Sequence, residues 1–259
     1  MEALLTILGS GTSMGVPTLG CSCRVCTSAD PRDTRSRPSI MIAYAGHRVV
    51  IDTGPDFRTQ MLREKIDRID AVLYTHSHAD HILGLDDLRP LTFRNEAKLP
   101  LYADDATASV LERIFDYTFS ASSSYPTRAR VELRRIAEPT GTVEIHGAAF
   151  QRIPLKHGWM DIAGYRFGNA AYLTDVSEIP DESLPLLENL DVLILDALRR
   201  TPHPSHSHLE NSIALVAQLK PRRAWFTHMG HELHHAETDA ELPPHIRLAY
   251  DGLRIPFEL

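Results

Sequence analysis

Cysteine is scarce in this sequence of 259 residues, which contains only three. All three lie within one hexapeptide, Cys21-Ser22-Cys23-Arg24-Val25-Cys26. An odd number of cysteines this close together cannot form a disulfide framework, so a disulfide-stapled secreted domain is excluded. In a reducing compartment such a cluster is more typical of a metal site.

Long apolar segments and an excess of basic residues are also missing from the sequence. No run reaches the about 18 consecutive apolar residues that a membrane-spanning helix needs. The net charge of −7 gives no bulk attraction for nucleic acid or for anionic membranes. The N-terminal stretch MEALLTILGSG lacks the basic region and the long apolar stretch of a secretory signal. We therefore expect a cytoplasmic protein with no membrane partner.

Short apolar runs bounded by glycine, proline or polar residues predict many strands. The expected strands cover residues 4–8, 40–44, 49–51, 71–74, 99–102, 150–154, 165–167, 171–173, 192–195 and 224–226. Apolar residues at helical spacing predict helices over 57–65, 106–115 and 209–219. The pattern predicts a mixed α/β chain with three or four helices and a surface loop over 120–127.

Ligand-type side chains gather in one short run, Thr75-His76-Ser77-His78-Ala79-Asp80-His81. A buried imidazole or carboxylate without a partner costs free energy, so a metal ion would explain the run better than a core. His76 and His78 face one way in an extended segment, and Asp80 and His81 can serve a second ion one turn onward. These donors suit zinc, manganese or iron. The alternative is a solvated loop.

Other ligand-type residues follow predicted strands. Asp52 comes after residues 49–51, Asp175 after 171–173 and His228 after 224–226. Side chains at strand ends point into a rigidly supported cleft, which is a common place for active sites. Taken alone, Asp175 is equally well explained as a helix cap.

The run His76-x-His78-x-Asp80-His81 resembles the signature of the metallo-β-lactamase superfamily. That family's remaining motifs follow in order, with Asp52 in Asp-Thr-Gly, His157 in Leu-Lys-His-Gly, then Asp175 and His228. The resemblance covers nearly the whole chain. It implies an α/β fold of the four-layer αββα kind.

The resemblance also implies a domain organisation and a ligand set. We expect residues 1–259 to form a single domain with a small zinc-binding loop at 20–26. One metal ion would be held by His76, His78 and His157, the other by Asp80, His81 and His228, with Asp175 bridging the two. Asp52 would orient a ligand rather than bind metal.

The N-terminal glycine-rich and cysteine-rich segments, residues 9–17 and 20–26, resemble those of PhnP-type phosphodiesterases of the carbon–phosphorus lyase pathway. The family carries a structural zinc on three such cysteines and one histidine. The matching residues are Cys21, Cys23, Cys26 and His231. Cys₃His is a closed tetrahedral set of the kind that structural zinc prefers. The alternative is a chance cluster of free thiols.

Three histidines stand just before the helix expected at residue 209, namely His203, His206 and His208. The resemblance implies that His206 protonates or stabilises the leaving oxygen, with Asp80 as the other catalytic residue. Histidine suits general acid catalysis because its free pKa lies near neutral pH. His203 and His208 are competing candidates. Asp196, at the end of its predicted strand, is interpreted as structural.

The resemblance implies a metal-dependent hydrolase that acts on small, cyclic phosphodiesters through a dinuclear centre of Mn²⁺, Zn²⁺ or iron, with one structural Zn²⁺. The sequence has no basic run, which argues against a large nucleic-acid substrate. Relatives are commonly dimers, which makes a homodimer one candidate assembly, and the sequence leaves the oligomeric state open. Two alternatives stay open. One is a lactone or thioester hydrolase on the same scaffold, and the other is a non-catalytic protein like PqqB of the pyrroloquinoline quinone pathway.

Overall fold

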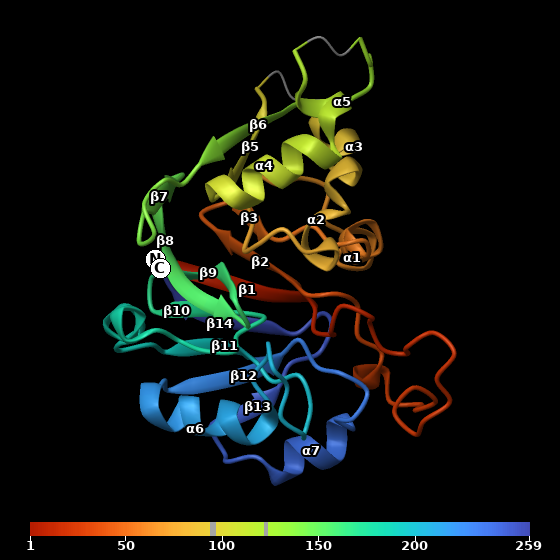
Figure 1. The fold of residues 1–259 in the computed structure, drawn as a ribbon, viewed down its shortest axis with the longest axis vertical. Coiled ribbons are helices and arrows are strands. Elements are labelled where there is room, and N and C mark those ends of the chain that lie inside the picture. The colour runs from red at the N-terminus through yellow and green to blue at the C-terminus, as the bar shows by residue number, and fades with distance from the viewer. Residues whose placement is uncertain (94–96, 122–123) are drawn as a thin grey trace.

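The computed structural model describes residues 1–93, 97–121 and 124–259. Two seven-stranded sheets lie between outer layers of helices, as Figure 1 shows. The expected four-layer αββα arrangement is therefore confirmed. Within the described ranges, no helix has the length and apolar composition needed to cross a membrane.

The first sheet is antiparallel on one side and parallel on the other. In spatial order its strands are β14 (Arg254–Glu258), β1 (Glu2–Gly9), β2 (Ser39–Tyr44), β3 (His47–Ile51), β4 (Ala71–Leu73), β5 (Leu99–Ala103) and β6 (Val131–Arg135). The pairs from β14 to β3 are antiparallel and the pairs from β3 to β6 are parallel. The carboxyl ends of β3 and β4 therefore meet at one edge.

The second sheet repeats this plan. In spatial order its strands are β13 (Ile246–Leu248), β12 (Arg223–Thr227), β11 (Val192–Asp196), β10 (Ala170–Leu173), β9 (Met160–Phe167), β8 (Ala148–His157) and β7 (Thr142–Ile145). The pairs from β13 to β10 are parallel, and the others are antiparallel. Strands β8, β10, β11 and β12 consequently all end at the same edge of this sheet.

Helices cover the outer face of each sheet. The α-helices are α1 (Phe57–Arg63), α2 (Ala79–Ile82), α3 (Arg89–Thr92), α4 (Asp105–Ile114), α5 (Asp116–Phe119), α6 (Leu209–Leu219) and α7 (His235–Glu241). The 3₁₀ helices of the described ranges are η1 (Pro31–Asp33), η2 (Leu85–Leu88) and η3 (Asp181–Leu187). In Figure 1 the helices α1 to α5 lie over the first sheet, and α6 and α7 lie over the second.

Successive side chains of a strand point to opposite faces of its sheet, so each strand contributes apolar residues to the layer between the sheets and to the layer under the helices. In β4, Ala71 and Leu73 join the apolar cluster between the two sheets, whereas Val72 joins the cluster under the helices of the first sheet. Burying an aliphatic side chain of this size contributes about 1.5–3 kcal/mol. This two-sided packing holds the strand firmly just before the histidine-rich run begins.

Every strand expected from the sequence is present, but the helix count of three or four was too low. Strands β6, β7, β13 and β14 and the short helices α2, α3, α5 and α7 were not predicted. Helix α7 buries only His235 and Thr238, so it has no apolar stripe to reveal it. The loop expected over 120–127 lies partly outside the described residues.

Candidate active site

The predicted ligands converge where the strands end. Asp52 follows β3, the run from His76 follows β4, Asp175 follows β10 and His228 follows β12, while His157 is the last residue of β8. Parallel strands deliver their carboxyl ends to one edge, so residues far apart in sequence become neighbours there. The topology therefore builds one cleft from both sheets.

The first ligand cluster has four donor atoms within 4.8 Å of one another, from His76, His78, His157 and Asp175. His76 Nε2 lies 3.0 Å from His78 Nδ1 and 3.9 Å from Asp175 Oδ2. His78 is exposed, whereas the other three side chains are buried. The cluster thus opens to solvent on the side of His78.

The second ligand cluster has the same compactness and is fully buried, with donor atoms from Asp80, His81, Asp175 and His228. His81 Nε2 lies 3.2 Å from Asp80 Oδ2 and 3.3 Å from Asp175 Oδ1. His228 Nε2 lies 3.2 Å from Asp175 Oδ2. Asp175 belongs to both clusters. Its Oδ1 faces His81 and its Oδ2 faces His228. It occupies the position of a bridging ligand.

Buried donor atoms without partners test whether metal ions fit these clusters. Among the described residues, none gives a hydrogen bond to His81 Nε2, His228 Nε2 or Asp80 Oδ2. A buried polar atom left unpaired is costly, so these atoms need a partner of another kind. Donors of a tetrahedral zinc site with bonds of 2.0–2.1 Å lie about 3.3 Å apart, which matches the separations in the second cluster. The residues fit a divalent ion.

Hydrogen bonds around the clusters fix which histidine nitrogen faces the centre. His81 Nδ1 donates to Asp52 Oδ2 over 2.7 Å, and His157 Nδ1 donates to the Ser205 carbonyl over 2.6 Å. Asp52 also accepts hydrogen bonds of 2.8 Å from the amide and the hydroxyl of Thr75. Such outer partners orient ligands and leave the second ring nitrogen free for metal. Asp52 therefore lies where the predicted orienting role requires.

Opposite charges dominate the buried centre. Burial lowers the pKa of His81, because it disfavours the charged imidazolium. The carboxylates of Asp80 and Asp175 have the larger effect and raise the pKa of His81 well above its usual value. Burial also opposes ionisation of Asp175, yet His228 and His81 hold the pKa of that carboxyl well below its usual range. The carboxylates of the centre consequently stay ionised, as a cation site requires.

Three residues of the centre adopt left-handed backbone conformations. The φ angles of Asp52, Asp175 and His228 are 67°, 59° and 58°. None is glycine, so each costs of the order of 1–3 kcal/mol, a strain that clusters at functional sites. Asp52 and His228 directly follow the ends of β3 and β12, and Asp175 comes two residues after the end of β10. The positive φ of each turns the chain out of the strand direction at the site.

Of the three candidate acids, only His206 joins the centre. Its ring stacks on that of His228 with centroids 4.8 Å apart, and its Nδ1 lies 2.9 Å from Asp196 Oδ2. His203 lies outside the centre, with its ring centroid 5.1 Å from that of His206. His208 instead directly precedes α6 as its N-cap residue, where its carbonyl accepts a hydrogen bond from the amide of Ser212.

Asp196 was interpreted as structural from the sequence, but the structure gives it a place in the centre. Its buried carboxylate contacts His206 and lies 3.9 Å from His228 Nδ1. Burial raises the pKa of Asp196 well above its usual value despite the opposing charge of His228. Its position at the end of the buried strand β11 was the sequence feature that could have indicated a place in the centre. Asp196 is the partner that fixes the His206 ring.

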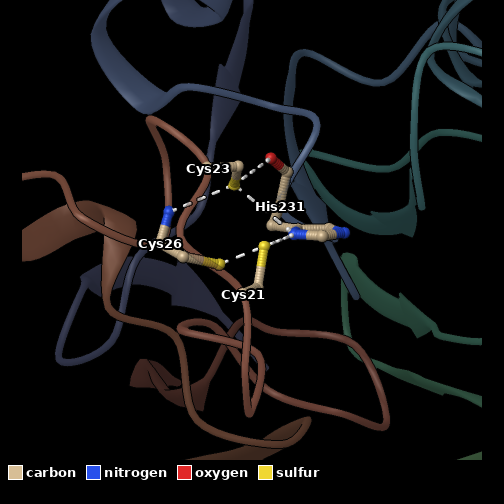
Figure 2. Close-up of side chains that lie close together, drawn as sticks. All are labelled: Cys21, Cys23, Cys26 and His231. Carbon is tan, nitrogen blue, oxygen red and sulfur yellow. Dashed lines mark hydrogen bonds between the residues drawn. The ribbon is translucent and has the colours of Figure 1, made fainter.

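The cysteines form a separate cluster with His231, shown in Figure 2. His231 Nδ1 lies 3.2 Å from the sulfur of Cys21 and 3.5 Å from the sulfurs of Cys23 and Cys26. In a tetrahedral zinc site, bonds of about 2.3 Å to sulfur and 2.0 Å to nitrogen place these atoms about 3.5 Å apart. The Cys26 amide lowers the pKa of Cys23 to about 6, which favours the thiolate that zinc binds. The set fits a structural zinc.

Replacing Cys23 by serine should remove this zinc and destabilise the protein, because three donors no longer close a tetrahedral site. We expect one zinc fewer per chain and a melting temperature lower by on the order of 10 °C. Metal analysis and thermal unfolding measure both, with the exposed neighbour Ser22→Ala as control. A variant that loses zinc but melts like the parent would contradict the structural role.

A buried arginine ties the segment that follows the cysteine loop to the loop that carries His228. The guanidinium of Arg35 donates to the carbonyls of Gly230 and Leu233 over 2.9 and 2.5 Å, and it pairs with Asp33 at 3.0 Å. Asp33 in turn accepts the amide of His235 over 2.8 Å. No sequence pattern indicated this contact, because its partners lie about 200 residues apart in the chain.

Arg35→Met should lower the free energy of unfolding by about 3–5 kcal/mol, because it leaves the buried carboxylate of Asp33 without its arginine partner. The matched control is Arg24→Met, which removes an exposed pair with Glu237. That change should cost less than about 1 kcal/mol. Denaturant unfolding compares the two variants. Equal effects would show that the buried arginine does not hold the loops together.

Comparisons with known proteins agree with this geometry. The profile of the β-lactamase superfamily domain matches residues 47–229. An octanoyltransferase of Porphyromonas gingivalis is 39% identical over 250 residues, which make up 95% of this chain and 50% of that protein. The chain thus spans about half the length of this curated relative. PQQ synthesis protein B of Methylorubrum extorquens is 26% identical, with 90% of this chain and 82% of that one covered.

Two solved structures extend the comparison. A diphosphatase from the PhnP family is 53% identical, with a TM-score of 0.94, and the match covers 100% of this chain and 98% of that one. Zinc-bound PqqB from Methylobacterium extorquens has a TM-score of 0.78 at 21% identity, over 97% and 99% of the two chains, and shares the fold.

The fold and the paired histidine–aspartate clusters define a metal-dependent hydrolase with a dinuclear-type centre. The chain belongs to the metallo-β-lactamase superfamily and, within it, to the PhnP family. The resemblance inferred from the sequence motifs is confirmed.

Proposed function

We propose that this hydrolase cleaves small phosphodiesters, cyclic ones included. The observation that carries the proposal is the pair of ligand clusters sharing Asp175, with His206 beside them. The diphosphatase at 53% identity supports a phosphoryl substrate. A diphosphate diester is a second candidate within the same chemistry, because its bridging oxygen leaves phosphorus as an alcohol does.

The ligand residues of the chain would be shared between two metal ions. His76, His78 and His157 would hold one ion, Asp80, His81 and His228 the other, and Asp175 would contact both. When bound, two such ions supply Lewis acidity, acidify water and neutralise the charge of the phosphoryl transition state. The mixed nitrogen and oxygen donors suit Mn²⁺ or Zn²⁺.

His206 is the proposed acid for the leaving oxygen. Burial and the nearby charge of His228 lower the pKa of His206 to about 4, so its ring is neutral at pH 7 before substrate binds. Nδ1–H is donated to Asp196, and Nε2 remains for substrate. An anionic phosphate beside Nε2 favours the imidazolium, so His206 gains a proton on binding. Water attacks phosphorus and releases a proton to the solvent, the P–O bond to the leaving group breaks, and the leaving oxygen takes the proton of His206.

A substrate panel tests the proposal against acyl chemistry. The name of the octanoyltransferase relative makes an acyl ester or thioester the alternative substrate. Purified protein loaded with Mn²⁺ would be assayed on bis(p-nitrophenyl) phosphate, p-nitrophenyl octanoate and an octanoyl thioester, with His76→Ala as control. We expect metal-dependent turnover of the phosphodiester that the control lacks. Turnover confined to the acyl substrates would replace this proposal with acyl hydrolysis.

A further inference from the structure

A further group of metal-ligating side chains lies at the opposite end of the strands from the active centre. It consists of His47, Asp70 and His146, whose donor atoms all lie within 4.8 Å of one another. His47 is the first residue of β3, Asp70 directly precedes β4, and His146 lies in the turn that leads into β8. The same three strands enter the active centre at their other ends. The ten residues of β8 therefore separate the two places by on the order of 30 Å.

Two tight turns, one from each sheet, carry the histidines. Residues 45–46 connect β2 to β3, and residues 146–147 connect β7 to β8. All four residues have positive φ angles, between 46° and 81°, as in two-residue turns that match the twist of their strands. The Tyr44 hydroxyl, at the first turn, donates to the Ile145 carbonyl at the second over 2.6 Å. The two imidazoles are therefore held by backbone of fixed geometry.

One buried donor atom of the group lacks a hydrogen bond. His47 Nδ1 has no hydrogen-bond partner among the described residues, and it lies 3.8 Å from Asp70 Oδ1. The other oxygen of Asp70 accepts the Arg48 amide over 2.8 Å, which fixes the carboxylate. Arg68 Nε lies 3.7 Å from Asp70 Oδ1, but the Arg68 side chain is 54% exposed, so solvent weakens this pair. A buried nitrogen without a partner needs a ligand of another kind.

Two imidazoles and one carboxylate are a donor set that zinc takes in proteins, with a fourth position left for water. The His146 ring stacks on the His47 ring, with centroids 3.9 Å apart and planes inclined by 3°. Donors of a tetrahedral zinc ion lie about 3.3 Å apart, closer than the 3.8 Å between His47 Nδ1 and Asp70 Oδ1. The side chain of His146 is exposed, so it can move inward without disturbing core packing. The group suits an ion that draws the three side chains together.

We propose that His47, Asp70 and His146 bind one Zn²⁺ ion that links the two sheets at this end. His47 and Asp70 hold the ion from the first sheet, and His146 holds it from the β7–β8 turn of the second. The ion is structural and takes no part in hydrolysis, so this inference is independent of the proposed phosphodiesterase function. An ion that binds only the folded chain stabilises that chain.

The test counts zinc in protein whose active centre and cysteine cluster are already loaded with zinc. Wild type, His146→Asn and Asp70→Asn would be dialysed against micromolar Zn²⁺ at neutral pH and analysed for metal. Asparagine adopts positive φ readily, so His146→Asn keeps the turn and removes only the imidazole. We expect wild type to hold one zinc per chain more than either variant. The matched control is His245→Asn, which removes an exposed histidine outside the group and should bind zinc like wild type.

Thermal unfolding separates a link between the sheets from an ion that merely binds the surface. Zinc at about 100 times its dissociation constant should raise the melting temperature of wild type by about 5–10 °C more than that of His146→Asn. Equal zinc counts in wild type and His146→Asn would overturn the site. An extra zinc in wild type without the rise in melting temperature would overturn the link between the sheets.

Discussion

Replacing Asp175 by alanine will remove both ions of the active centre and lower phosphodiester turnover by about 10⁴-fold or more. The reason is its position, because one carboxylate faces donor atoms of both clusters. Asp175 Oδ2 lies 3.9 Å from His76 Nε2 of the first cluster and 3.2 Å from His228 Nε2 of the second, and Oδ1 lies 3.3 Å from His81 Nε2 of the second. Losing it therefore opens both sites at once, whereas losing His78 would open only one.

The matched control for this change is Asp161→Ala, which removes an exposed aspartate from β9 in the same sheet. Metal analysis of both purified variants, with zinc at the cysteine cluster counted separately, gives the direct readout. The control should keep its metals and its activity. If Asp175→Ala retained two ions in the centre, the bridging assignment would be wrong.

His206→Ala should lower turnover by about 10²- to 10⁴-fold while leaving the metal content intact. Its ring lies against His228 and is fixed by Asp196, yet His206 is outside both ligand sets. The loss should depend on the leaving group. An alkyl alcohol needs a proton as it leaves, whereas p-nitrophenolate is stable without one, so the defect should be largest on alkyl esters.

His203→Ala and His208→Ala serve as matched controls, since each removes one imidazole from the same segment. His208 belongs to the start of α6, so its replacement should change turnover little. A defect of equal size on alkyl and p-nitrophenyl esters would contradict the acid role. Loss of metal from His206→Ala would instead place this residue among the ligands.

The metal ligands between His76 and His81 could be predicted from the sequence, because these donors are close together in the chain. The run from His76 to His81 occupies six positions directly after a buried strand, and imidazole and carboxylate at that spacing have few explanations other than metal. The distant members were different. His157 alone would pass for an ordinary histidine, and only the family's motif order selected it.

Contacts that depend on tertiary packing could not be predicted. Asp196 sits at the end of a strand like many structural acids, and only the folded chain brings His206 to its carboxylate. Arg35 meets two backbone carbonyls from a segment about 200 residues away. Strand β14 contains Pro256 and alternates exposed and buried residues at a sheet edge, where pattern is weak.

The central claim is that two metal ions in this centre carry out phosphodiester hydrolysis. Its most direct test is a titration of Mn²⁺ into protein whose active-centre metals have been removed, with turnover of bis(p-nitrophenyl) phosphate followed at each addition. Turnover should rise and saturate at two equivalents per chain beyond the zinc of the cysteine cluster. Full turnover without added metal, or none at saturation, would contradict it.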